Sequence, residues 1–144
     1  MQRGTAGFLG GVIAGFIKLV IEQISLAINI STSSMPGTIS KILFGQSGTY
    51  PFFSWIIYIL ITGLVGWILS KIISKKYTIN FLFSGTITGI VLWSLMNVVF
   101  MLSGTITPTW SMGLGTCIVT FFSHIVLGIV ITYTISKSQI KVTN

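Results

Sequence analysis

One short segment of this chain places an acid and a base at helical spacing. Lys18 and Glu22 are four residues apart, so on a helix their side chains are neighbours and form an ion pair. Gly11 and Gly15 continue the same stripe, and Glu22 is the only acidic residue in the chain. A charge near the centre of a membrane helix costs about 3 kcal/mol on the insertion scale. The pair is therefore either a functional site or a self-neutralising structural pair, and both interpretations stay open.

Two more polar residues are predicted at a similar depth in other apolar stretches. Asn97 belongs to the third stretch of the chain and His124 to the fourth. We expect a buried layer that contains Lys18, Glu22, Asn97 and His124 as a candidate intramembrane polar site. Because histidine titrates near neutral pH, His124 is either a proton carrier or a satisfied packing residue.

The residue types that are missing exclude most catalytic and metal centres. The chain has one Glu, one His, one Cys and no Asp, which are too few for a metal site. Cys117 is the single cysteine, so no disulfide forms within the chain. The glycines open an apolar helix rather than follow a strand, which argues against a phosphate loop. We expect no cofactor, no metal ion, no catalytic residue and no enzymatic activity.

Glycines recur every four residues in two of the apolar stretches. Gly7, Gly11 and Gly15 share one helix face, and Gly85 and Gly89 repeat the spacing. Small residues let helix backbones approach closely, and this packing drives helix association in lipid. The pattern, a glycine zipper, predicts helix packing and an oligomer formed through a glycine face.

Composition indicates a membrane protein. Hydrophobic residues make up 52% of the chain and charged residues 6%, whereas soluble domains carry roughly a quarter charged residues. The net charge of +7 would suggest a nucleic-acid partner in a soluble protein. Here the basic residues flank apolar runs, so we expect a lipid bilayer as the partner and no nucleic acid.

Four apolar stretches are each long enough to cross about 30 Å of hydrocarbon as a helix. They cover residues 5–30, 52–74, 79–103 and 112–135. All three prolines lie between them, as expected for a residue that breaks helices. In the loop 31–51, Pro36 is expected to open a short helix that lies on the membrane surface or caps the bundle, with Gly45 just past its end. The first stretch is too long for a signal peptide and is expected to be retained.

The positive residues predict the orientation of the spans. Arg3, Lys71, Lys75, Lys76, Lys137 and Lys141 fall on one side, and Lys41 alone falls on the other. Because positive charge stays cytoplasmic, both termini are predicted inside. The predicted fold is therefore an all-α, integral membrane four-helix bundle that forms one domain over residues 1–144.

The two halves of the chain resemble each other. Residues 10–23 align with 84–97, which matches Gly11 to Gly85 and Gly15 to Gly89, and residues 64–75 align with 126–137. The alignment indicates two helical hairpins related by an axis along the membrane normal, a parallel repeat. Chance is the alternative, because membrane helices share a small alphabet of residues.

The segment GGVIAGFIKLVIEQ, residues 10–23, resembles the start of YagU-type bacterial inner-membrane proteins. The segment from Asn80 to Lys137, with Leu114-Gly115-Thr116 and SHIVLGIVITY, is similar to small four-helix membrane proteins of Firmicutes. The first loop lacks the paired prolines of the YagU pattern. The resemblance implies the fold and a bacterial cytoplasmic membrane, and it assigns no catalytic residue.

Two function classes follow. The first is a small transporter or channel of unknown substrate, in which Glu22 and His124 respond to protons or cations and Lys18 is the counter-ion. The second is a structural or accessory subunit, whose partner is a second copy or another membrane protein. Water access separates them, because a transport site must be hydrated and a packing pair can be dry.

Overall fold

The structure, a computed structural model, describes residues 2–45, 51–73 and 80–140. Within these ranges the chain is helical and has no strand. The elements are α1 (Arg3–Ala27), α2 (Met35–Phe44), α3 (Pro51–Ile72), α4 (Phe81–Ser103), the 3-10 turn η2 (Thr109–Ser111) and α5 (Leu114–Ile140). All except α2 and η2 are long and apolar enough to cross a membrane.

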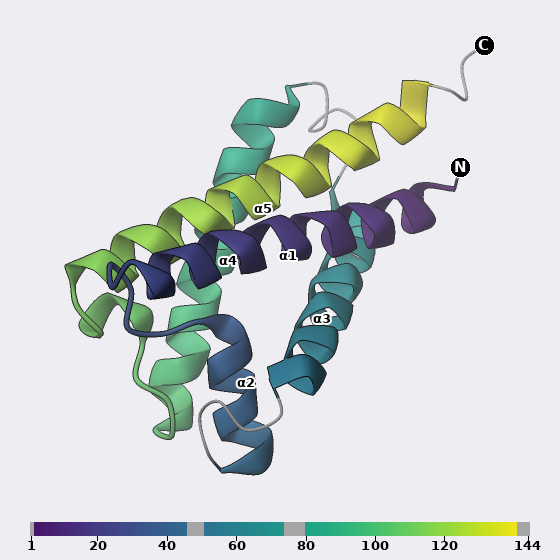
Figure 1. Cartoon of the computed structure of the whole chain (residues 1–144). Helices are drawn as coiled ribbons and strands as arrows, with labels where there is room; N and C mark the ends of the chain where they lie inside the picture. Colours follow the sequence, from purple (N-terminus) through teal and green to yellow (C-terminus); the bar gives the residue numbers. More distant parts are fainter. Residues whose placement is uncertain (1, 46–50, 74–79, 141–144) are drawn as a thin grey trace.

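The long helices are arranged around a central antiparallel pair. Figure 1 shows α1 and α5 side by side, with α3 and α4 crossing this pair. α1 packs against α3 and α5, and α5 packs against α4. α3 and α4 instead face each other across an apolar cleft of about 370 Å³ that is lined by Leu69, Ile72, Val91 and Leu92. The bundle is therefore open between α3 and α4.

The first helix ends three residues before the predicted boundary at residue 30. The amides of Ile30 and Ser31 turn back to the carbonyl of Ser25, and Asn29 adopts a left-handed conformation with φ 58°. The backbone beyond the turn contacts α5, where the Thr32 amide donates to Thr116 Oγ1 over 3.0 Å. This contact between distant segments pulls the chain off the helix axis, which local hydrophobicity does not reveal.

The loop 31–51 contains the short helix that Pro36 predicted. Ser34 caps α2 by accepting the Gly37 amide, and Gly45 ends the helix in a left-handed conformation with φ 72°. Ile39 on α2 is buried with Leu19 and Tyr58, whereas Ile42 and Leu43 are exposed. One face of α2 therefore covers the bundle.

The last two helices also differ from their predicted bounds. α4 begins at Phe81, not residue 79, because the Asn80 side chain caps it through the Phe83 amide. α5 begins at Leu114, after Gly113 with φ 102°, and continues past residue 135 to Ile140. Polar residues in this last turn bond back to the helix, as when Ser138 Oγ donates to the Ile135 carbonyl over 2.7 Å.

Three of the described positive residues, Arg3, Lys71 and Lys137, lie at one end of the molecule. The Arg3 guanidinium donates to the carbonyl of Ile73, just after α3. The rings of Phe81 and Tyr133 contact each other at 5.1 Å between centroids, and Lys137 lies over the Tyr133 ring. We call this the Arg3 end and the opposite end, which carries α2 and η2, the α2 end. Of the predicted cluster, Lys75, Lys76 and Lys141 lie outside the described residues.

Candidate functional site: a buried polar layer beneath a hydroxyl-lined pocket

Lys18 and Glu22 form the ion pair that their spacing predicted. Their side chains are 1% and 0% exposed. The second Glu22 oxygen, Oε2, accepts the amide of Met35 over 2.8 Å. Met35 is the first residue of α2, where the amides of a helix carry partial positive charge. Glu22 therefore binds Lys18 with one oxygen and the start of α2 with the other.

The Tyr58 ring of α3 packs against this pair. The Lys18 ammonium lies 5.6 Å from the centroid of the Tyr58 ring, a distance at which the ring face attracts a cation. Tyr58 is 3% exposed and packs with Leu19 and Ile39, so it shields the pair. Within the described residues its hydroxyl has no hydrogen-bond partner.

Asn97 makes its hydrogen bonds to a different part of the chain, between α4 and α5. Its Oδ1 accepts the Thr109 amide over 2.6 Å and the Thr109 hydroxyl over 2.8 Å, and its Nδ2 donates to the Trp93 carbonyl. Thr109 is the first residue of η2. Asn97 thus fastens the segment between α4 and α5, and none of these bonds joins it to Lys18 or Glu22.

His124 is buried in the contact between α4 and α5. Its Nδ1 lies 2.6 Å from the Thr120 carbonyl of its own helix, and its backbone lies against Gly89. The imidazole is also within electrostatic range of Lys18. The four residues of the predicted layer are all buried. The structure joins Lys18 to Glu22 directly, brings His124 within electrostatic range of Lys18 and leaves Asn97 separately bonded.

The predicted glycine faces pack within the chain. A Cβ on Gly7 or Gly11 would overlap the α3 backbone, and one on Gly15 would overlap the Thr62 side chain. A Cβ on Gly85 or Gly89 would overlap the α5 backbone. Gly66 and Gly128 are the opposing residues at these two crossings. The four-residue glycine spacing did not reveal them, because neither has another glycine four residues away.

The two crossings have the same construction. Gly66 lies against Gly7 and Gly11, and Gly128 lies against Gly85 and Gly89. The contacts therefore match Gly7 to Gly85 and Gly11 to Gly89. This register differs by one helical turn from the alignment of 10–23 with 84–97, which matched Gly11 to Gly85. Sequence identity between two apolar helices does not fix the register of their alignment, because several registers match similar numbers of residues.

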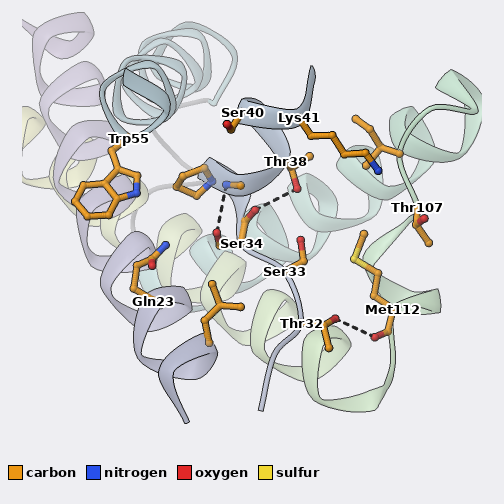
Figure 2. A pocket seen from close by; sticks show the side chains of 14 residues that line it. Gln23, Thr32, Ser33, Ser34, Thr38, Ser40, Lys41, Trp55, Thr107 and Met112 are labelled. Atoms are coloured by element: carbon orange, nitrogen blue, oxygen red, sulfur yellow. Dashed lines mark hydrogen bonds between the residues drawn. The ribbon is translucent and has the colours of Figure 1, made fainter. Parts of the chain in front are cut away.

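A pocket of about 570 Å³ opens at the α2 end, above the Lys18–Glu22 pair. Figure 2 shows Gln23 of α1, Lys41 of α2, Trp55 of α3 and Thr107 of the α4–η2 connection around it. We call it the Lys41 pocket. Lys18 and Glu22 do not line it, although Gln23 is the next residue along α1. The ion pair is therefore not exposed in the wall of the pocket.

The described residues hold no group of three His, Cys, Asp or Glu side chains that could bind a metal ion. Comparison of the chain with protein-family models, with curated proteins and with solved structures found no match.

Proposed function

We propose that this chain is a non-catalytic, multi-pass membrane protein of the structural or accessory class. In this role α1, α3, α4 and α5 span a bacterial cytoplasmic membrane, with the Arg3 end on the cytoplasmic side. The gathering of Arg3, Lys71 and Lys137 at that end supports this orientation. The resemblance to YagU-type proteins supports the location.

The state of the Lys18–Glu22 pair carries the proposal. Both side chains are shielded from solvent, and Glu22 uses both oxygens on groups of its own chain. A transport site must exchange its partners with a solute or with water, whereas a packing pair stays closed. Glu22 also accepts the Met35 amide and so holds the start of α2. This structural function goes beyond its pairing with Lys18.

The partner of an accessory protein is expected on lipid-facing surfaces. Gly7, Gly11, Gly85 and Gly89 are taken up by contacts within the chain, so a homo-oligomer through these faces would require α3 or α5 to move away. A partner membrane protein or a second copy therefore docks on other apolar surfaces. The similar crossings at Gly66 and Gly128 support a parallel repeat of two helix pairs, α1 with α3 and α4 with α5.

Ion or proton flux in liposomes tests the proposal. The purified chain, Glu22→Gln and Lys18→Met/Glu22→Gln are reconstituted, and flux is measured over several ions and pH values. We expect no flux above protein-free liposomes from any of the three. The complementary measurement is crosslinking in the native membrane, where the chain is expected in a species larger than the monomer.

A small transporter or channel is the second candidate, and the Lys41 pocket favours it. The pocket reaches Gln23, one residue from Glu22, so a modest movement of α2 would connect it to the charged pair. Flux from the wild type that disappears in folded Glu22→Gln protein would establish this candidate and overturn the structural role.

A further inference from the structure

The Lys41 pocket contains polar side chains that no other described residue engages. Gln23, Ser33, Lys41 and Thr107 line it from four different segments of the chain. Within the described residues none of these four side chains has a protein hydrogen-bond partner. Polar groups that converge on a pocket from several segments are typical of a ligand site.

Other hydroxyl groups fix the shape of the pocket. Ser34 accepts the Gly37 amide and Thr38 donates to the Ser34 carbonyl, which holds the first turn of α2. Thr32 bonds the Met112 carbonyl and Thr116, which holds the preceding segment on α5. Because these hydroxyls are engaged, the wall is built before a ligand arrives and the unengaged donors stand on a fixed frame.

The positive charge of Lys41 in the pocket favours an anionic ligand. Among the residues that the structure describes, Lys41 is the only charged one that lines it. Glu22 is the only acidic residue of the chain, and it is engaged by Lys18 and Met35. Lys41 therefore has no side-chain carboxylate available within its own chain. Figure 2 shows its side chain extending from α2 toward the segment that carries Thr107.

We propose that the Lys41 pocket binds a phosphate ester, carried by an anionic lipid headgroup or by a small soluble molecule. Phosphate oxygens accept hydrogen bonds in several directions, which suits donors placed on several walls, and lysine is an established phosphate-binding residue. The pocket, at about 570 Å³, has room for more than a bare phosphate ion. Leu26, Trp55 and Met112 supply apolar wall for the rest of the ligand.

Binding to the purified full-length chain in a maltoside detergent tests this site. The probes are phosphatidylglycerol, phosphatidylcholine and glycerol phosphate, and bound lipid is measured by native mass spectrometry and bound glycerol phosphate by equilibrium dialysis. The variants are Lys41→Gln in the pocket and Lys137→Gln at the Arg3 end, which removes the same charge. Thr107→Val is a second pocket variant at an exposed position.

We expect Lys41→Gln to weaken phosphate binding about tenfold, since a hydrogen bond to a charged group is lost. Thr107→Val should weaken it less, and Lys137→Gln should leave it unchanged. Binding of phosphatidylglycerol alone identifies a lipid headgroup, and binding of glycerol phosphate, with displacement of lipid, identifies a soluble ester. The proposal would be overturned if neither phosphatidylglycerol nor glycerol phosphate binds, or if Lys41→Gln and Lys137→Gln weaken binding equally.

Discussion

At the scale of single residues, two buried side chains fasten the segments that follow their helices. Glu22 accepts the amide of Met35 at the start of α2, and Asn97 accepts the amide of Thr109 at the start of η2. In lipid no water replaces a lost partner, so a buried acceptor that holds a backbone amide satisfies both groups at once. Polar residues in apolar stretches can thus serve the fold without taking part in any chemistry.

The Lys18–Glu22 pair predicts a specific pattern of stabilities. Glu22→Leu leaves a buried ammonium and an unpaired Met35 amide, and breaking a buried pair on one side costs about 3–5 kcal/mol. Lys18→Met/Glu22→Gln removes both charges and keeps an acceptor for Met35, so it should regain most of the lost stability. Thermal unfolding in detergent checks this order. Equal stability of wild type and Glu22→Leu would mean that the buried pair does not form.

Asn97 gives a second prediction at this scale. Asn97→Ala leaves the Thr109 amide and hydroxyl without their acceptor, and an unsatisfied buried group costs about 1–3 kcal/mol. The variant should lower the free energy of unfolding by that amount. Ser111→Ala is the matched control, because the Ser111 hydroxyl bonds the Pro108 carbonyl at an exposed position. Denaturant titration of both variants in mixed micelles is the measurement, and similar losses would contradict the role of Asn97.

At the scale of helices, glycines set how closely α3 approaches α1 and how closely α4 approaches α5. Gly66 lies against the carbonyl of Gly7 and the backbone of Gly11, where a Cβ has no space. A neighbouring backbone does not yield as a flexible side chain does, so any larger residue must push the helices apart. Packing contacts are the main association force between helices in lipid.

Gly66→Ala is therefore expected to destabilise the α1–α3 contact, since overpacking costs about 1–3 kcal/mol. Gly4→Ala is the matched control, because a Cβ there meets only the Trp67 and Lys71 side chains, at 3.2 Å or more. The midpoint of thermal unfolding should fall in Gly66→Ala and stay near the wild-type value in Gly4→Ala. A midpoint for Gly66→Ala at or above that of Gly4→Ala would show that the crossing is looser than described.

At the scale of the whole molecule, the distribution of charge divides the bundle into two unlike ends. The Arg3 end carries Lys71 and Lys137 beside aromatic rings, and the α2 end carries Lys41 and hydroxyl groups. Charge asymmetry of this kind orients membrane proteins. The cleft between α3 and α4 interrupts the ring of helices on one side, and the two helix pairs pack together mainly through α1 and α5.

Orientation is testable by labelling with a membrane-impermeant maleimide in cells. In a Cys117→Ala background, Ser111→Cys at the exposed α2 end should react in intact cells. Lys137→Cys at the Arg3 end should react only after the membrane is permeabilised. The reverse order of labelling would place the termini outside the cytoplasm.

The sequence by itself determined the number and approximate extent of the long helices, the short helix that contains Pro36 and the pairing of Lys18 with Glu22. These features depend on local properties: the length of an apolar run, the position of proline and glycine, and the four-residue spacing of neighbours on a helix. The grouping of Arg3, Lys71 and Lys137 at one end follows from the alternation of direction between successive long helices.

Only the tertiary structure decided what the polar layer does and how the helices meet. The acceptors of Met35 and Thr109, the Tyr58 ring over Lys18 and the opposing glycines Gly66 and Gly128 all join segments that are distant or lack a sequence signal. The register of the two crossings and the turn after Ala27 were likewise set by contacts between helices. A hydrophobic pattern does not distinguish one apolar side chain from another. The packing partner of each side chain is therefore set by the fit of their shapes in the folded structure.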